Sequence, residues 1–447
     1  MNHWKQVDPL MQDQGEKVLQ TLLEHGFQAF YVGGCVRDEL MGRPVHDMDI
    51  ATSAKPDDVI RLFERTVPTG IQHGTITVLM GSFAFEVTTF RKESQYADHR
   101  RPTSVEFVDA VTEDLQRRDF TMNAIARDID GHLTDPFCGQ ADIERGVIRC
   151  VGLAEERFEE DALRMVRAIR FASVFGFRPV KSLWKALVHG KDKLTYIAIE
   201  RVRIELEKTI LGPKPLRGLA LLERSGLLEH AKVSLPKYEN SEGLLHAQKV
   251  WLSALDQLPA TPEALRWSLL FQTLGLPGDE VASYMKSWTF PNATAQETAA
   301  IVRFDEGWSK AKSEKDAVGE SESGKELLRR AWIKLEILFS KSVAALWLNR
   351  QCLIASTLAC NEKRQTEQNL LRQAQIWHDE VRVHTLSELA VNGGEVQQMT
   401  GRKGGPWLGE LMKELLLATA YGDVLNEKQA LLDRVNTVVK ETWDQAD

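Results

Sequence analysis

The sequence predicts an α+β head, with a small mixed and mainly antiparallel sheet flanked by helices, followed by a long all-helical extension. Two observations predict this fold class. Short runs of β-branched and aromatic residues, bounded by Gly-containing turns, are concentrated in the first 150 of the 447 residues. After about residue 151, apolar residues recur at helical spacing almost to the end of the chain.

The head elements follow from local patterns. Three apolar segments predict two strands and then a helix that begins with a proline: residues 27–32, 48–51 and 56–65. Residues 75–80 and 83–90 predict a hairpin closed by Gly81 and Ser82. Asp130 and Gly131 predict a second hairpin turn.

The extension begins with four predicted helices, at residues 157–175, 182–188, 200–211 and 215–225. Further helices separated by Pro and Gly turns follow to the end. Residues 311–325 are polar, with almost no large apolar side chain, and predict a loop or linker between helical units.

Composition excludes several classes of protein. Hydrophobic residues make up 43% and charged residues 27%, which is typical of a globular chain rather than a disordered one. The five cysteines show no CxxC spacing, and neither an N-terminal signal core nor a long apolar segment is present. We therefore expect a soluble cytoplasmic protein without membrane association.

The charge balance restricts where a polyanion can bind. The net charge is −8, so such a partner must meet a local basic patch. Residues 157–208 contain twelve Lys and Arg against seven acidic residues. This segment either faces phosphates or is simply a solvated helical face, and charge alone favours neither reading.

The first chemical motif combines GGCVRD at residues 33–38 with DMD at residues 47–49. On a strand, Asp47 and Asp49 project from the same face and can converge on one cation, and such hard oxygen ligands suit Mg²⁺. The Gly-Gly turn lets backbone N–H groups approach a triphosphate, whose charge Arg37 could neutralise. Each part alone is commonly a turn or a cap. Together they favour phosphoryl or nucleotidyl transfer.

The second motif is RRDFTMNA at residues 117–124. Arg117 and Arg118 are predicted on the polar side of an amphipathic helix, where they are either a surface feature or a source of bidentate contacts to phosphates. Asp119 and Asn123 lie four residues apart and could bond to each other or cap a turn.

The third motif is EDALRMVRAIR at residues 160–170. Asp161 and Arg164 are i,i+3 neighbours, so one interpretation is an intrahelical ion pair worth about 0.2–0.5 kcal/mol. The alternative is base recognition: a carboxylate accepts from the exocyclic amine of cytosine or adenine, and an adjacent Arg donates to ring acceptors. Such a pair would select C and A over U and G.

These motifs resemble those of a known family. GGCVRD, DMDIAT, RRDFTMNA, DPFCG, EEDALRMVRAIRF and ERVRIELEK are similar, in order, to the signatures of class II tRNA nucleotidyltransferases. These are the CCA-adding enzymes and bacterial poly(A) polymerases of the DNA polymerase β-like superfamily. The similarity extends over residues 26–226. A weaker match, LAVNGGEV and GRKGGPWLGELMKEL, lies in the tail.

The resemblance implies an elongated arrangement of four parts: a catalytic head (1–150), a neck for base recognition (151–226), a helical body (227–325) and a tRNA-binding tail (326–447). It implies that Asp47 and Asp49 are catalytic and bind Mg²⁺. Nucleotide contacts are implied for Gly34, Arg37, Arg118, Asp161, Arg164, Arg167 and Arg170. Glu86, on a predicted strand, is a candidate third carboxylate or else a solvent-facing acid.

The polar segment 91–103 corresponds to the flexible loop that, in this family, helps the switch from adding C to adding A. Its candidate residues are Arg91, Tyr96, Arg100 and Arg101. The loop has its full length, which argues against an enzyme that adds only CC. It does not separate a complete CCA-adding enzyme from one that adds only A.

The predicted function is therefore template-independent addition of C, C and A to the 3′ end of tRNA, from CTP and ATP, with release of pyrophosphate. The alternatives are an A-adding enzyme or a poly(A) polymerase of the same family, and a non-catalytic RNA-binding scaffold. The tRNA acceptor stem and elbow would lie along the helical part, read through phosphates and 2′-hydroxyls. Residues 401–407 could offer N–H groups to a phosphate or form only a turn. The protein is expected to be a monomer or a homodimer.

Overall fold

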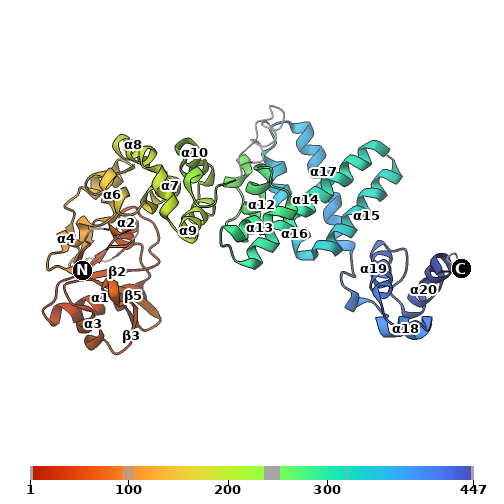
Figure 1. Cartoon of the computed structure of the whole chain (residues 1–447), viewed down its shortest axis with the longest axis horizontal. Helices are drawn as coiled ribbons and strands as arrows, with labels where there is room; N and C mark the ends of the chain where they lie inside the picture. The colour runs from red at the N-terminus through yellow and green to blue at the C-terminus, as the bar shows by residue number, and fades with distance from the viewer. Residues whose placement is uncertain are drawn as a thin grey trace. The chain divides into compact units, whose positions relative to one another are not determined.

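The computed structural model describes residues 4–93, 96–97, 101–102, 105–235, 252–319 and 321–443. The chain divides into two compact units, Met1–Leu235 and Pro236–Asp447 (Figure 1), and each is described by itself. Within the described ranges, every helix is too short or too polar to cross a lipid bilayer.

The first unit is built on a mixed sheet. Among its described residues, seven strands pair in the order β11-β10-β1-β2-β5-β4-β3. Their bounds are β1 Ala29–Val32, β2 Asp49–Thr52, β3 Thr66–Gly70, β4 Thr75–Met80, β5 Phe83–Thr89, β10 Ala126–Arg127 and β11 Leu133–Thr134. Within this seven-stranded sheet, only the β2–β5 pair is parallel. The predicted, mainly antiparallel sheet and both hairpins are confirmed.

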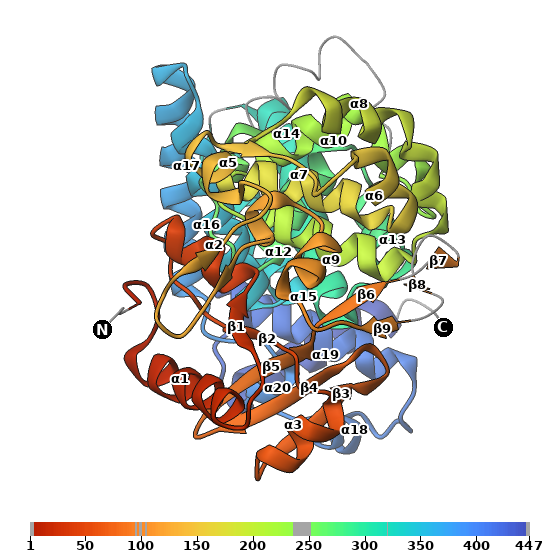
Figure 2. The same cartoon turned by 90° about the vertical axis from the view of Figure 1, so that its left-hand side faces the viewer.

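Helices cover both faces of this sheet. α1 (Pro9–Glu24) and α3 (Pro56–Leu62) lie beside β4 and β5 on one face (Figure 2), where Val18 and Val59 share a core with Ile50. Successive residues of β2 alternate between faces, so Ala51 instead joins the opposite core with Leu115 of α4 (Val111–Gln116). α2 (Gly34–Leu40) and α5 (Gly139–Glu144) complete the head.

The helix predicted around Arg117 and Arg118 ends earlier than expected. α4 stops at Gln116, and Arg117 is its C-cap. The reason lies at Phe120, which adopts an extended backbone, pairs with Cys150 in an antiparallel bridge and packs its buried ring edge-on against Phe171. The tertiary contact therefore overrides the helical pattern, and the prediction that these arginines lie on a helix is wrong.

Helices follow the sheet in the first unit. They are α6 Ala154–Glu160, α7 Leu163–Phe175, α8 Lys181–His189, α9 Ile199–Ile210 and α10 Pro215–Ser225. The predicted helix over 157–175 is wrong in one respect, because it breaks at Asp161. The Asp161 carboxylate accepts the N–H of Leu163 at 3.0 Å and thus competes with helix continuation.

The second unit is helical throughout its described residues, as predicted. Its longer helices are α12 Ala264–Thr273, α13 Gly278–Ser287, α14 Asn292–Val318, α15 Glu322–Phe339, α16 Lys341–Thr357, α17 Asn361–Glu380, α18 Gly393–Thr400, α19 Pro406–Tyr421 and α20 Lys428–Trp443. Four tryptophans form the centre of its larger core: Trp308, Trp332, Trp347 and Trp377.

The linker predicted over 311–325 is wrong. α14 continues to Val318 and α15 begins at Glu322. Ala311 packs into the tryptophan core, and the Lys, Glu and Ala residues that follow are strong helix formers even without apolar contacts. The helix ends only at Gly319, whose φ of 85° leaves the helical region.

Candidate active site

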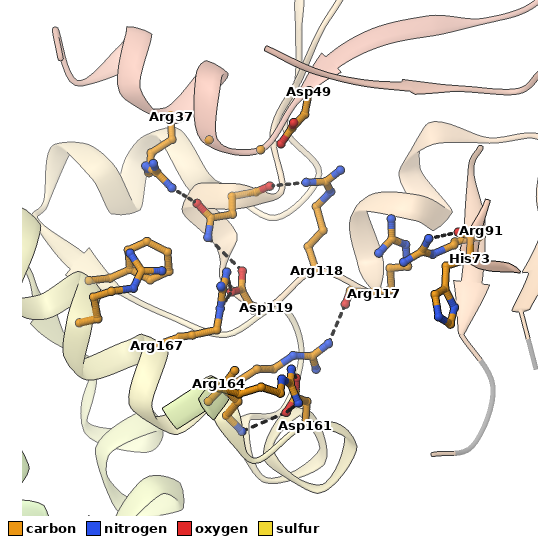
Figure 3. A pocket seen from close by; sticks show the side chains of 17 residues that line it. Arg37, Asp49, His73, Arg91, Arg117, Arg118, Asp119, Asp161, Arg164 and Arg167 are labelled. Atoms are coloured by element: carbon orange, nitrogen blue, oxygen red, sulfur yellow. Dashed lines mark hydrogen bonds and ion pairs between the residues drawn. The ribbon is translucent and has the colours of Figure 1, made fainter. Parts of the chain in front are cut away.

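A cavity of about 750 Å³ lies within the first unit (Figure 3). It is bordered by the β1–α2 turn, the start of β2, the end of α4 and the first turns of α7. The lining residues are Gly33, Gly34, Arg37, Asp49, His73, Arg91, Arg117, Arg118, Asp119, Asn123, Asp161, Leu163, Arg164, Arg167, Arg170, Phe171 and Arg201. All the residues predicted to contact a nucleotide are among them.

The charge of the cavity wall is strongly positive. Eight arginines face three aspartates among the lining residues. Walls of one charge sign concentrate ligands of the opposite sign. The cavity is therefore suited to a ligand with several negative charges, and planar guanidinium groups suit phosphate oxygens in particular.

Three carboxylates lie at the start of β2, just before it and on the neighbouring strand β5. Asp49 is the first residue of β2 and is half-buried, and Asp47, two residues earlier, is exposed. In the neighbouring parallel strand, Val87 pairs with Ile50. Glu86 and Asp49 each come one residue earlier, so they occupy neighbouring positions on the same face of the sheet.

The electrostatics of Asp49 reflect this grouping. Its pKa is raised to about 6, first by burial and then by the negative charges of Asp47 and Glu86, while Arg118 acts in the opposite direction. Carboxylates gathered against their mutual repulsion are the hard oxygen donors that Mg²⁺ prefers. The residues present therefore fit a divalent cation. Asp49 lines the cavity, whereas Asp47 and Glu86 do not.

Arg118 lies directly against the β1–α2 turn. Gly33 has φ +75°, and a Cβ added there would stand 2.8 Å from Arg118 Nη1. The guanidinium also donates to the Asn123 carbonyl oxygen and to Asp114, each at 3.5 Å. Glycine at position 33 is thus required both by its backbone conformation and by the approach of this arginine.

Arg37 lines the cavity but is held by other protein groups. Its Nε and Nη2 donate to the two carboxylate oxygens of Asp38 at 3.0 and 2.8 Å, and Nη1 donates to Asn123 Oδ1 at 2.6 Å. The guanidinium carbon lies 4.7 Å from the ring centroid of Phe175. Arg37 is therefore fixed in place at the cavity wall.

Asp119 joins the RRDFTMNA segment to α7. Its Oδ2 accepts from Arg167 Nε at 2.9 Å, and its Oδ1 accepts from Asn123 Nδ2 at 3.0 Å. Burial raises the pKa of Asp119, but Arg167, the Asn123 bond and Arg164 outweigh it and hold the pKa well below its usual range. The sequence predicted that Asp119 and Asn123 either bond to each other or cap a turn, and their hydrogen bond confirms the first of these alternatives.

Asp161 and Arg164 both line the cavity but do not pair with each other. Asp161 instead accepts from both terminal nitrogens of Arg201, at 2.8 and 3.4 Å. Arg164 forms an ion pair with Glu160 and donates to the carbonyl oxygen of Arg117 at 3.1 Å (Figure 3). The prediction of an intrahelical ion pair between Asp161 and Arg164 is therefore wrong.

Two further arginines of α7 meet one acid of α9. Arg170 and Arg167 both form ion pairs with Glu205, which is only 4% exposed. The guanidinium of Arg170 also lies 3.8 Å from the ring centroid of Phe171. α9 thereby holds the arginine row of α7 against the cavity.

The segment expected to be a loop begins as a strand. β6 (Arg91–Glu93) pairs antiparallel with β9 (Val105–Phe107), and β7 (Tyr96–Ala97) pairs with β8 (Arg101–Pro102). Arg91 lines the cavity, only the backbone of Tyr96 and Arg101 is described, and Arg100 lies outside the described residues. An ion pair between Lys92 of β6 and Glu113 of α4 helps to hold β6 against α4.

Sequence patterns alone miss several residues of the cavity wall. Arg201 belongs to the ERVRIELEK motif, and its i+4 spacing from Glu205 on α9 was an available signal. His73 lies on a single 3₁₀ turn, η1 (Ile71–His73), and no pattern around it predicts a position at the cavity.

The fold and cavity define a nucleotidyltransferase head joined to helical regions. A family model described as “Poly A polymerase head domain” matches residues 29–149. Two more, “Probable RNA and SrmB- binding site of polymerase A” and “tRNA nucleotidyltransferase domain 2 putative”, match residues 176–235 and 259–435.

Individual relatives narrow the class. The CCA-adding enzyme of Geobacillus thermodenitrificans (strain NG80-2) is 37% identical over 427 residues, covering 93% of this chain and 94% of the relative. That of Limosilactobacillus reuteri (strain DSM 20016) is 35% identical, covering 97% and 98%. The crystal structure of the Bacillus stearothermophilus CCA-adding enzyme in complex with CTP is 33% identical, covers 98% of this chain and 100% of that chain, and has a TM-score of 0.77. The chain belongs to the CCA-adding enzyme family of class II tRNA nucleotidyltransferases.

Nucleotidyltransferases of this family generally use a divalent metal. In the described part of the chain, one group of three potential ligands has its atoms within 4.8 Å of one another: Asp128, Asp130 and His132. This group lies on the β10–β11 turn, and none of its members lines the cavity.

Proposed function

We propose that this chain adds C, C and A in turn to the 3′ end of tRNA, using CTP and ATP and releasing pyrophosphate. The observation that carries the proposal is the cavity of eight arginines and three aspartates, which has Asp49 on one side and Asp161 with Arg164 on the other (Figure 3). The Asp49 side would support phosphoryl transfer, and the side with Asp161 and Arg164 would support recognition of a base.

In the proposed reaction, the terminal 3′-hydroxyl of the tRNA attacks the α-phosphate in line and pyrophosphate leaves. Asp47 and Asp49 would hold Mg²⁺, with Glu86 as a further candidate ligand. When bound, Mg²⁺ supplies positive charge that activates the hydroxyl and stabilises the departing phosphates. Arg118 binds the triphosphate, so that positioning and electrostatics provide most of the catalysis.

Arg37 and Gly34 would form the nucleotide side of the β1–α2 turn. Arg37 is fixed by Asp38 and Asn123, which leaves part of its guanidinium toward the cavity. Arg167 and Arg170, held by Asp119 and Glu205, would line the rest of the nucleotide pocket.

Asp161 and Arg164 would select the base. A carboxylate has about four acceptor positions. Three of those on Asp161 are occupied by Arg201 and the Leu163 N–H, so one remains for the exocyclic amine of cytosine or adenine. The carbonyl of uracil or guanine at that place would meet a negative charge. Arg164 would donate to a ring acceptor.

The four-part division made from the sequence is retained as part of the proposal: head 1–150, neck 151–226, body 227–325 and tail 326–447. The tail would bind tRNA, and residues 401–407 run into the start of α19 at Pro406, whose N-cap is Gly405. We further propose a cytoplasmic location and a monomeric or homodimeric state.

The test is extension of a tRNA transcript that ends at its discriminator base. CTP alone should add two nucleotides, and CTP with ATP should add three. An A-adding enzyme or a poly(A) polymerase would instead extend nothing with CTP alone. A non-catalytic scaffold would bind the tRNA without extending it under either condition.

A further inference from the structure

One buried carboxylate contacts three of the arginines that line the cavity. Asp114, on α4, is fully buried with no exposed surface. Its Oδ1 accepts from Arg117 Nε at 2.9 Å and from the backbone N–H of Arg91 at 3.3 Å. Its Oδ2 lies 3.5 Å from Arg118 Nη2. Asp114 itself does not line the cavity.

Two of these arginines, Arg117 and Arg118, share the charge of Asp114 through their side chains. Arg117 and Arg118 are adjacent in sequence, and the side chain of each is only 17% exposed. Two cations packed together with little water repel each other unless an anion lies between them. Asp114 is the anion that meets both.

Few protein groups hold the guanidinium of Arg118 besides Asp114. It donates to Asp114 and to the Asn123 carbonyl oxygen over long distances, 3.5 Å in each case. Its Nε is buried and has no hydrogen-bond partner among the described residues. The opposite side of the guanidinium meets the backbone of Gly33. Its direction is therefore set by Asp114 on one side and by the glycine turn on the other.

We propose that Asp114 is a positioning residue: it orients Arg118 toward the triphosphate and anchors β6 through the Arg91 amide. This inference rests on the proposed function only in naming the triphosphate as the ligand. It does not place Asp114 in contact with the substrate.

The experiment measures binding to the full-length chain by calorimetry, with inorganic tripolyphosphate and with CTP as probes. Asp114→Asn keeps the shape but removes the charge, and should weaken tripolyphosphate and CTP binding by about tenfold. Glu113→Gln is the matched control: the neighbouring acid of α4 pairs with Lys92 outside the cavity, and its loss should change either affinity by less than twofold.

A double variant separates positioning from a general loss of structure. If Asp114 acts through Arg118, then Asp114→Asn should cost less than threefold in a chain that already carries Arg118→Met. A further tenfold loss in that background, or unchanged tripolyphosphate affinity of Asp114→Asn, would overturn the inference. Should Asp114→Asn not fold, Asp114→Glu, which keeps the charge but displaces it, should weaken tripolyphosphate binding at least threefold, and unchanged affinity would again overturn it.

These measurements are independent of catalysis. A wild-type chain that binds tripolyphosphate and CTP but extends no tRNA would refute the proposed function. The affinities of the Asp114 variants would still decide the role of Asp114.

Discussion

At the scale of single residues, the environment of Asp49 is central to the proposed chemistry. Burial and two neighbouring carboxylates raise its pKa to about 6, so its ionised form is less favoured than that of a free aspartate and would be stabilised by a cation. A residue kept for folding would be expected to have a compensating partner. Here, the raised pKa of Asp49 supports the proposed cation site.

Asp49→Asn should reduce nucleotide incorporation to background, because it removes a proposed metal ligand. The same change removes charge repulsion, so the thermal unfolding temperature in EDTA should be unchanged or higher. Incorporation of labelled CTP and thermal unfolding are the two measurements. Asp57→Asn, at an exposed acid of α3, is the control and should leave both unchanged. Full incorporation by Asp49→Asn would contradict the assignment.

Asp161→Ala should weaken base selection, because the acceptor for the exocyclic amine is lost. A bidentate base contact is worth about 1–3 kcal/mol, so kcat/KM for CTP should fall by roughly 10- to 100-fold. The kcat/KM for UTP should fall much less, so the ratio of kcat/KM for CTP to kcat/KM for UTP should decrease. The ratio serves as its own control, since a folding defect lowers both values equally. An unchanged ratio would show that Asp161 does not read the base.

Individual site residues were predictable where a local motif carried them. Asp49, Arg118 and Asp161 all line the cavity at the positions expected from short sequence patterns. The partners of these residues could not be predicted from the sequence. Arg201, for example, is 40 residues from Asp161 and contacts it only because α9 packs beside α7. Spacing along the chain carries no information on such contacts.

At the scale of elements, the β1–α2 turn positions the nucleotide side of the cavity. Gly33 combines φ +75° with ψ −122°, a backbone conformation open almost only to glycine. The turn starts α2 and at the same time leaves space for the Arg118 guanidinium.

Gly33→Ala should lower the free energy of unfolding by about 1–3 kcal/mol and raise KM for CTP, because the new Cβ displaces Arg118. Gly42→Ala is the matched control. Gly42 also has positive φ, +64°, but no atom lies within 4 Å of its added Cβ, so stability should fall while KM stays unchanged. Equal KM values for the two variants would contradict the proposed role of this turn.

Asp119 connects the RRDFTMNA segment to α7 through Arg167. Asp119→Asn should lower the free energy of unfolding by about 3–5 kcal/mol, the usual cost of breaking a buried pair. Because the pKa of Asp119 is lower in the folded than in the unfolded chain, this contribution is complete above about pH 4 and is lost as the pH falls further.

Urea unfolding of wild type and Asp119→Asn between pH 7 and pH 3 measures this difference. The exposed pair of Asp13 and Lys17 on α1 provides the control, since Asp13→Asn should change stability by less than about 1 kcal/mol. If the difference in free energy of unfolding between wild type and Asp119→Asn became larger as the pH falls, the prediction would be contradicted.

Elements were predictable where pattern and packing agree. The β4–β5 hairpin follows two runs of β-branched and aromatic residues joined at Gly81 and Ser82, and its strands pair antiparallel as expected of a hairpin. Besides the end of α4, two helix boundaries were not predictable. The break at Asp161 depends on a side-chain bond, and the extension of α14 through a polar stretch depends on helix propensity and on the packing of Ala311.

At the scale of the whole molecule, the nucleotidyltransferase head and its helical continuation follow the family to which the chain belongs. The fold class was predictable because strand and helix patterns occupy separate parts of the chain. In the proposed function, the cavity and the tRNA end together decide which nucleotides are added, and this requires a direct test.

The most direct test is the product length obtained from three tRNA transcripts, ending before CCA, after CC and after CCA, with each nucleoside triphosphate supplied separately. We expect two additions from CTP on the first transcript, one from ATP on the second and none on the third. Extension of the third transcript, or no addition of C to the first, would contradict the proposed function.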